Sequence, residues 1–369
     1  VGTFMREWLS LYDSKSGERG MYNGASAKSQ VEKLNQREKD ENQEFIKRRE
    51  PREDFGTNPC SEIILRSREF CNLSECIVRR HDTAESLAKK VRIATIIGTF
   101  QSTLTNFRYL TKEWERNCSD ERLLGVSLTG ILDNPLTSGR KKGLDELLQN
   151  LRKVAVETNK EWADKLGVNR SAAITCVKPS GTVSQLVDSA SGIHARHSEY
   201  YIRTVRADNK DPLCQMMKQS GFPNEPDVTK PNHTTVFSFP TQSPKGAICR
   251  TDMTALEQLE LWSTYQEHWC EHKPSITVSV KDEEWPEVGS WVWENFDDIS
   301  GISFLPFSDH TYRQAPYQDC TKQEFDDMSK TIPKDVDWST LSQFEQQDFT
   351  SGSQELACSA DGGCEIVDI

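Results

Sequence analysis

Amphipathic helical segments alternate with short apolar runs of strand length along much of this chain. Residues 84–104 place apolar side chains three and four positions apart, and residues 143–166 repeat that pattern. The run 171–177 (SAAITCV) follows the second of these helices directly and ends at a Lys-Pro pair. Alternation of this kind is typical of an α/β protein, which is the fold class that the sequence predicts.

The same order of elements recurs further along the chain. We expect a helix over residues 253–272, a strand at 275–280, a short helix at 288–296 and another strand at 301–305. The polar stretch 22–54 predicts a solvated helix that leads into turns. The helix at 84–104 is expected to pack on the core through its apolar positions, which are Leu87, Val91, Ala94, Ile97 and Phe100.

Length and charge limit what the protein does. Its 369 residues suffice for one large domain or two ordinary ones, and its net charge of −12 argues against an extended basic surface for nucleic acid. No run of about 18 apolar residues and no secretory signal is present, so we expect a cytoplasmic protein with no membrane partner. The chain begins at Val1 without a methionine, which suggests a piece of a longer protein.

A cysteine lies in a rigid polar turn, Asn58-Pro59-Cys60-Ser61-Glu62, ahead of an apolar run. In extended backbone the side chains of Asn58, Cys60 and Glu62 would point to one side, so that an amide, a thiol and a carboxylate converge. Such a trio fits a thiol activated by Glu62, or a radical site, and it also fits a buried cysteine beside a turn. Cys71 follows, and its thiol either faces the same cavity or is structural.

Residues 175–186 predict a strand that runs into a Ser-Gly-Thr turn and then a helix. Backbone N–H groups at such a helix start favour an anion such as phosphate, although an ordinary serine-capped helix fits equally well. Lys178, His194, Arg196 and His197 lie close enough in sequence to help neutralise an anion. The candidate phosphate-binding residues are Pro179, Ser180, Gly181, Thr182, Val183 and Ser184.

Two cysteines, Cys358 and Cys364, lie in a final stretch rich in Ser, Gly, Ala and Asp. Five small or flexible residues between them allow a disulfide on a mobile tail that reaches another site. Half of a zinc site is the alternative, but it needs two more ligands that no nearby Cys or His pair supplies. We therefore predict a redox-active tail and no metal site.

In this order, the segments resemble the catalytic chain of ribonucleotide reductases. Members of that family carry an Asn-x-Cys-x-Glu turn, a Pro-Ser-x-Thr phosphate loop and a C-terminal cysteine pair, all of which have counterparts here. The runs 14–20, 125–130 and 301–306 are also similar to the vitamin-dependent class II enzymes. The tyrosine pair of class I and the glycyl-radical segment of class III are not apparent, so the closest resemblance is to the monomeric, triphosphate-using class II type.

The resemblance implies a mechanism and its cofactor. Adenosylcobalamin would generate a thiyl radical on Cys60, which removes the 3′ hydrogen of a ribonucleoside triphosphate. Glu62 would act as the base on the 3′ hydroxyl, and Asn58 would hold the ribose hydroxyls. Cys71 would belong to the reducing thiol pair, which Cys358 and Cys364 regenerate with thioredoxin or a similar dithiol.

The resemblance also implies the second half of a ten-stranded α/β barrel with Cys60 on a central finger loop. We expect a catalytic portion at residues 1–335 and a mobile redox tail at 336–369. The second active-site thiol and the effector region of the family lie in an N-terminal half, so we expect this chain to need that half as a partner. Two alternatives remain: a class I ribonucleoside-diphosphate reductase chain, and a catalytically incomplete nucleotide-binding fragment.

Overall fold

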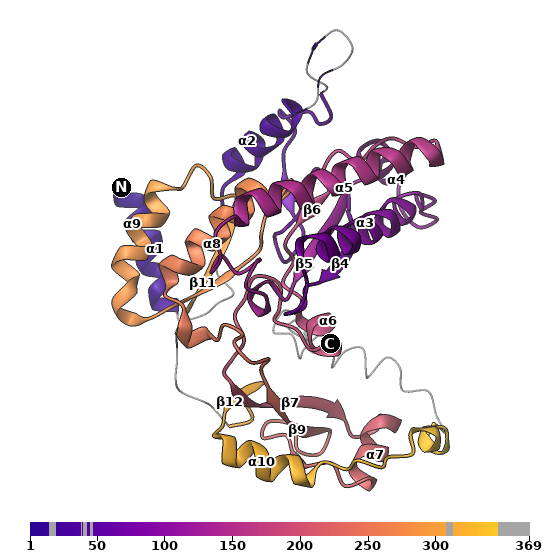
Figure 1. The fold of residues 1–369 in the computed structure, drawn as a ribbon, viewed down its shortest axis with the longest axis vertical. Coiled ribbons are helices and arrows are strands. Elements are labelled where there is room, and N and C mark those ends of the chain that lie inside the picture. Colours follow the sequence, from indigo (N-terminus) through magenta and orange to yellow (C-terminus); the bar gives the residue numbers. More distant parts are fainter. Residues whose placement is uncertain (15–19, 38, 40–42, 45–46, 308–312, 346–369) are drawn as a thin grey trace. The chain divides into compact units, whose positions relative to one another are not determined.

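The computed structural model describes residues 1–14, 20–37, 39, 43–44, 47–307 and 313–345. The chain divides into two compact units (Figure 1). The first unit comprises Val1–Arg196 and Gly246–Phe307, and the second comprises His197–Lys245 and Ser308–Ile369. No helix in the described parts of the chain is long and apolar enough to cross a bilayer.

A parallel sheet in the order β4-β5-β6 lies at the centre of the first unit. Its strands are β4 (Asn72–Ile77), β5 (Leu124–Thr129) and β6 (Thr175–Cys176). Every residue of β5 is buried, as expected for a middle strand with both faces covered. The connections carry α3 (Ala84–Gln101) and α4 (Lys112–Glu121) before β5, and α5 (Leu144–Leu166) before β6. The predicted α/β order is confirmed here, although the ladder of β6 is shorter than the apolar run 171–177.

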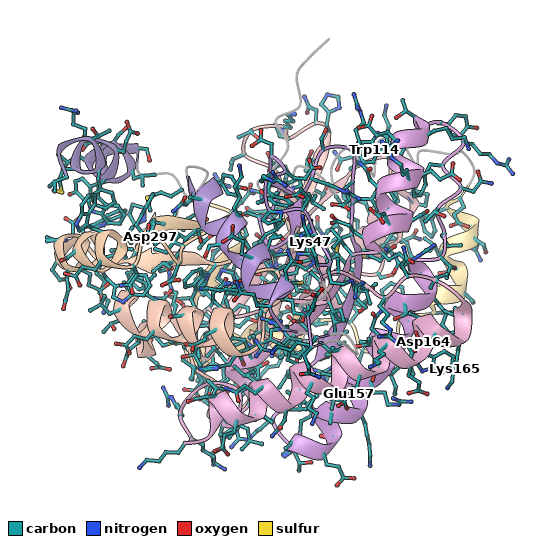
Figure 2. The ribbon with its side chains drawn as sticks, turned by 90° about the horizontal axis from the view of Figure 1, so that it is seen from above. Lys47, Trp114, Glu157, Asp164, Lys165 and Asp297 are labelled. Carbon is teal, nitrogen blue, oxygen red and sulfur yellow. The ribbon has the colours of Figure 1, made fainter. Side chains whose placement is uncertain are left out.

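Helices α3 and α5 lie side by side against this sheet (Figure 1). Figure 2 shows Glu157, Asp164 and Lys165 along the outer side of α5. The expected core contacts of α3 are only partly right, because Ile97 and Phe100 are exposed. Gly98 lies near the Leu124 side chain, so the face of α3 that carries Gly98 packs toward the sheet. The buried positions are Leu87, Val91, Ala94, Thr95, Gly98 and Thr99.

A second sheet, in the order β1-β11-β10, completes the first unit. Strand β11 (Gly301–Pro306) pairs in parallel with β10 (Thr277–Val280) and antiparallel with β1 (Gly20–Tyr22). Helices α1 (Gly2–Ser14), α8 (Ala255–His268) and α9 (Trp285–Glu294) flank it, and Trp8 packs against Trp285 and Phe304. The four elements predicted downstream of residue 253 are therefore present.

A short hairpin carries the cysteine turn. Strands β2 (Gly56–Thr57) and β3 (Ile64–Leu65) pair antiparallel through two residue pairs, Gly56 with Leu65 and Thr57 with Ile64. The loop between them holds Asn58, Cys60 and Glu62. Upstream, the polar stretch forms α2 (Gly24–Asn35), whose N-cap is Asn23.

The second unit is an antiparallel sheet in the order β12-β7-β9-β8. The long strands β7 (Tyr200–Asp208) and β9 (Thr234–Gln242) form its middle, with β8 (Asn224–Pro226) and β12 (Tyr317–Asp319) at the edges. Helices α7 (Pro212–Gln219) and α10 (Lys322–Thr331) and the 3-10 helices complete the described elements, together with α6 (Gly181–Leu186) in the first unit. None of these four strands was predicted from the sequence.

The sheet topology can be compared with the ten-stranded barrel that the resemblance implies. The described residues form a mixed α/β fold with four separate sheets, and none of these sheets closes on itself. The α/β class is thus confirmed, whereas half of a ten-stranded barrel stays a prediction.

Candidate active site

Cys60 lies exposed in the loop of the β2–β3 hairpin. The Ser61 N–H donates to the Asn58 carbonyl at 2.8 Å, and Ser61 has a φ of 69°. A non-glycine residue in this left-handed region is uncommon and needs surrounding support. The backbone here is a tight turn, so the extended geometry used in the sequence analysis was wrong.

The turn nevertheless brings Asn58 and Glu62 together. The Asn58 amide nitrogen donates to Glu62 Oε1 at 2.7 Å, while the Asn58 amide oxygen accepts from the Ile63 N–H at 3.0 Å. Glu62 is fully buried, and its other oxygen, Oε2, has no hydrogen-bond partner among the described residues. A buried carboxylate oxygen without a donor costs free energy, so this atom is ready to accept a hydrogen bond from a ligand.

Lys178 links the carboxylate to the cysteine. Its Nζ lies 3.2 Å from Glu62 Oε1. Burial opposes the charged form, but the charges of Glu62 and Cys60, and hydrogen bonds to both, raise the pKa of Lys178. From the sequence, Lys178 was expected only as a possible phosphate neighbour, since nothing in its spacing indicates contact with residues more than a hundred positions earlier.

Cys71 lies just before β4, near Glu62 and Lys178. Burial raises the pKa of its thiol well above the usual value, and the negative charge of Glu62 raises it further. Cys176 of β6, which the sequence analysis did not select, is fully buried, and burial, Glu62 and Cys71 raise its pKa in the same way. The structure therefore brings Cys71 and Cys176 into the electrostatic reach of the Cys60 turn.

The predicted phosphate loop forms as a turn and a short helix, α6. Ser180 is its N-cap: the Ser180 hydroxyl accepts from the Ser184 N–H at 3.1 Å, and the Ser180 N–H donates to Ser191 Oγ at 2.9 Å. Gly181, Thr182 and Val183 are exposed at the start of the helix. The serine-capped helix start is thus present, and an anion site at the exposed turn stays a prediction.

Glu75 of β4 is a second residue that the sequence analysis missed. Its carboxyl group forms hydrogen bonds with the hydroxyls of Ser180 and Thr129, and it interacts with the positive charge of Lys178. Burial raises the pKa of Glu75 in spite of these three contacts. A raised pKa favours the neutral form, which reduces repulsion between this side chain and an anion at the α6 turn.

Three of the four expected anion-neutralising residues are otherwise engaged. Arg196 is buried in ion pairs with Asp133 at 2.9 Å and Asp188 at 2.8 Å. His194 Nδ1 lies 3.0 Å from the Ser191 carbonyl and Nε2 accepts from the Thr277 N–H, while burial lowers the pKa of this histidine. A neutral His194 carries no charge to offer an anion. His197 lies in the second unit, where its Nε2 is 3.0 Å from Asp319 Oδ1.

Residues 272–275 run along the cysteine turn and hold it; we call them the clamp segment. The Lys273 N–H donates to the Glu62 carbonyl at 3.2 Å, and Lys273 Nζ donates to Ser61 Oγ at 2.8 Å. Ser275 Oγ donates to the Cys60 carbonyl at 2.6 Å. On its other side the clamp segment bonds to the strand before the phosphate loop, where the Ser275 N–H donates to the Val177 carbonyl at 2.8 Å.

The first two residues of the clamp segment are fully buried. His272 Nδ1 accepts from the Ile64 N–H at 3.3 Å, and its Nε2 lies 3.1 Å from the Leu124 carbonyl, so the ring is neutral and carries its proton on Nε2. Burial lowers the pKa of His272 to about 3 and that of Lys273 to about 7, although the Glu62 charge favours protonated Lys273.

The remaining predicted site residues, Cys358 and Cys364, lie outside the described residues.

Comparison with known proteins identifies relatives with a single shared name. The chain is 28% identical to the adenosylcobalamin-dependent ribonucleoside-triphosphate reductase of Lactobacillus acidophilus, over 76% of this chain and 41% of that protein. It is 28% identical to the Euglena gracilis enzyme of the same name, over 78% of this chain and 39% of that protein. It is 30% identical to a probable enzyme of this kind from Dictyostelium discoideum, over 78% of this chain and 38% of that protein.

Solved structures show the same likeness in the fold. A B12-dependent (class II) ribonucleotide reductase matches with a TM-score of 0.68 and 25% identity, covering 79% of this chain and 44% of that one. The class Id ribonucleotide reductase alpha subunit of Actinobacillus ureae matches with a TM-score of 0.51 and 13% identity, over 82% of this chain and 61% of that one, which shows the fold alone. No family model matches the chain.

The chain spans about 40% of the length of the curated relatives it matches. The resemblance that its motifs indicated is confirmed, because the curated homologues of this chain are adenosylcobalamin-dependent ribonucleoside-triphosphate reductases.

Proposed function

We propose that this chain is the catalytic portion of an adenosylcobalamin-dependent ribonucleoside-triphosphate reductase, in which Cys60 carries the radical. One observation supports this role above the others. The exposed thiol of Cys60 lies in the same turn as Glu62, a buried carboxylate with one oxygen that lacks a donor among the described residues. A ribose whose 3′ hydroxyl donates to that oxygen would satisfy it, with its 3′ hydrogen near the sulfur.

The exposure of Cys60 also fits the cofactor. A thiol that loses its hydrogen atom to a bound cofactor must be accessible, and Cys60 is exposed, whereas Cys71 is half-buried and Cys176 is buried. When bound, adenosylcobalamin supplies the radical chemistry that no amino-acid side chain supplies alone. The protein's part is then to orient the ribose and to move protons at stated atoms.

Each step uses a group of the turn or its neighbours. The Cys60 thiyl radical takes the 3′ hydrogen atom, and Glu62 takes the proton of the 3′ hydroxyl while Asn58 orients both hydroxyls. The 2′ C–O bond breaks, and the oxygen leaves as water with a proton from one of the two reducing thiols. Cys60 finally returns a hydrogen atom to the 3′ carbon, while Glu62 returns its proton to the 3′ oxygen.

Two thiols supply the two electrons and two protons of the reduction. Cys71 is one of them, and burial keeps its sulfur protonated, as a hydrogen donor must be. The other thiol belongs to the N-terminal half of the reductase, as the resemblance implies. Both lose hydrogen and form a disulfide, so that one ribonucleotide and two thiols give one deoxyribonucleotide, one water and one disulfide.

The triphosphate is assigned to the loop from Pro179 to Ser184, with Lys178 between the phosphates and the Glu62 carboxylate. Cys358 and Cys364 regenerate the thiol pair by exchange and are reset by thioredoxin or a similar dithiol. The open sheets of the first unit belong to a ten-stranded barrel that the N-terminal half completes, and residues 336–369 form the redox tail.

The test is a turnover assay with ribonucleoside triphosphates, adenosylcobalamin and a dithiol. It is run on this chain alone and with the N-terminal part of the Lactobacillus acidophilus enzyme. We expect deoxyribonucleotide product in the combined assay, and none with Cys60→Ala, which should still bind nucleotide. A Cys60→Ala variant that forms product at the wild-type rate would refute the radical role, and nucleotide binding without turnover in either assay would indicate a binding module.

A further inference from the structure

We infer that the first unit carries a second anion site, a basic pocket that binds a small oligophosphate outside the Cys60 site. The pocket has a volume of about 550 Å³ and lies between the end of α2, the outer side of α5 and the loop that follows α5. None of the residues assigned to the thiols, Glu62 or the α6 turn lines it. The inference goes beyond the proposed reductase function and does not depend on it.

The charge of the lining carries the inference. Four arginines and three lysines line the pocket against two glutamates, in a chain whose net charge is −12. Two of the arginines are paired with carboxylates, Arg37 with Glu271 at 2.6 Å and Arg170 with Asp164 at 2.9 Å, and the remaining basic side chains keep the lining positive. Positive charge concentrated in a concave site of a negatively charged protein attracts anions. The arginines are Arg37, Arg48, Arg152 and Arg170.

The positive charges of the pocket repel one another, as the pKa of Arg152 shows. Burial lowers the pKa of this guanidinium, and the nearby charge of Arg37 lowers it further. Its NH1 group donates to the Glu267 carbonyl at 2.8 Å, an acceptor that carries no full charge. A bound phosphate oxygen would offset the repulsion between Arg37 and Arg152 by charge-assisted hydrogen bonds.

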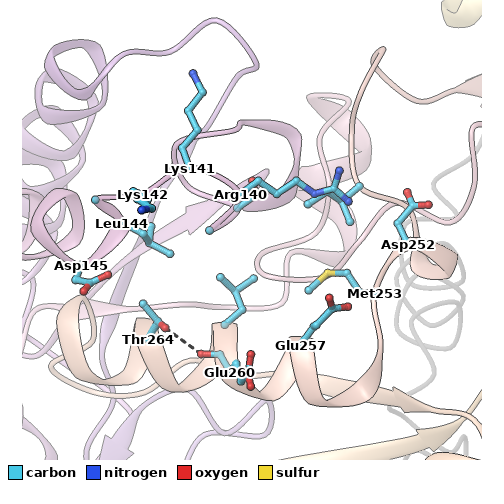
Figure 3. A pocket seen from close by; sticks show the side chains of 15 residues that line it. Arg140, Lys141, Lys142, Leu144, Asp145, Asp252, Met253, Glu257, Glu260 and Thr264 are labelled. Carbon is cyan, nitrogen blue, oxygen red and sulfur yellow. Dashed lines mark hydrogen bonds between the residues drawn. The ribbon is translucent and has the colours of Figure 1, made fainter.

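An excess of positive charge is not common to the pockets of this unit, as a second pocket shows. That pocket, of about 380 Å³, lies between the loop ahead of α5 and helix α8 (Figure 3). Its basic residues, Arg140, Lys141 and Lys142, stand against four acidic ones, among them Glu257 and Glu260 of α8. The balance of charge there is slightly negative, so this pocket offers no preference for an anion.

Size and lining define the ligand class. A volume of about 550 Å³ suits a molecule the size of a nucleotide. The apolar side chains of Leu34, Val156 and Ile174 line the same pocket and offer a surface for a base. The shared chemistry is an oligophosphate, which either inorganic triphosphate or a nucleoside triphosphate supplies.

The experiment measures binding by isothermal titration calorimetry on the 369-residue chain. Inorganic triphosphate and ATP are the two probes. The test variant is Lys153→Glu/Lys160→Glu, on the exposed rim of the pocket, and the control is Lys89→Glu/Lys112→Glu, which makes the same charge change on exposed lysines of α3 and α4. Substitution of Ser180 by Ala is added, so that binding at the α6 turn is recognised separately.

We expect binding that weakens with salt and that falls at least about tenfold in the pocket variant. The Lys89→Glu/Lys112→Glu and Ser180→Ala variants should keep this binding. Tighter binding of ATP than of inorganic triphosphate would identify a nucleotide as the ligand, and equal binding would identify the phosphates alone. No triphosphate binding to the wild-type chain, or equal losses in the pocket variant and the control, would overturn the inference.

Discussion

Lys273 Nζ donates a hydrogen bond to Ser61 Oγ at 2.8 Å across 212 positions of sequence. Ser61 is the residue between Cys60 and Glu62, and its φ of 69° is the strained point of the turn. The buried lysine thus holds the one residue whose conformation sets the separation of the thiol and the carboxylate.

The first prediction concerns the pH dependence of stability. The pKa of Lys273 falls from its ordinary value near 10.5 to about 7 in the folded chain. Between these values the unfolded chain binds more protons, so this residue makes the free energy of unfolding increase as pH rises from about 7 to about 10.5. Lys273→Met should remove that increase, as measured by urea unfolding at pH 7 and pH 9.5. Equal pH dependence in wild type and variant would show that the lysine is not desolvated as the structure indicates.

The second prediction concerns Gly301. A Cβ at this position would overlap both Lys273 Nζ and Ser61 Oγ, whereas a Cβ at Gly56, in the same hairpin as Cys60, would meet nothing within 4 Å. Gly301→Ala should lower the free energy of unfolding by about 1–3 kcal/mol, as overpacking usually does. It should also reduce turnover in the combined assay, because the Lys273–Ser61 hydrogen bond that holds the turn must shift. Gly56→Ala is the matched control, and equal effects of the two substitutions would contradict the predicted contact.

Removing the positive charge beside Glu62 gives the third prediction. Lys178→Met leaves the buried carboxylate without its cation, and loss of a partner from such a pair is strongly unfavourable. We expect kcat in the combined assay to fall by about 10–100-fold, and Lys178→Arg to retain more activity than Lys178→Met. If instead KM alone rises and kcat is unchanged, Lys178 acts on substrate binding and not on the Cys60 turn.

The fourth prediction uses the reactivity of the thiols. Cys60 is exposed, whereas burial raises the pKa of Cys71 and Cys176 and keeps them protonated. An alkylating reagent at pH 8 should therefore modify Cys60 well before Cys71 or Cys176, as followed by peptide mass spectrometry over time. In 6 M urea the three rates should become similar. Equal rates in the native chain would place Cys71 at the surface.

Much of the first unit follows from local patterns. Helix α5 has strong apolar periodicity, and the Ser-Gly-Thr turn does begin a helix with Ser180 as its cap. Apolar spacing alone did not decide which residues of α3 are buried, because this helix packs through the face that carries Leu87, Val91 and Gly98. Ile97 and Phe100 consequently remain exposed.

The site was predictable only where its residues are neighbours in sequence. Asn58, Cys60 and Glu62 share one turn, so their convergence was expected, although on a different backbone geometry. The bonds from Lys273 to Ser61, from Lys178 to Glu62 and from Glu75 to Ser180 join residues on separate segments, and no spacing rule identifies them. The antiparallel sheet of the second unit was missed for a related reason, since its strands do not follow the helix-strand order seen in the rest of the chain.

The two residue pairs between β2 and β3 have a consequence for how the protein is made. A hairpin this short does not hold its shape alone in water, and the bonds that fix the Cys60 turn come from His272, Lys273 and Ser275. During synthesis on the ribosome, the thiol therefore has no defined position until the clamp segment has emerged and docked. A nascent or truncated chain that ends before it lacks an ordered Cys60 turn, so the turn takes its shape only in molecules that have finished folding.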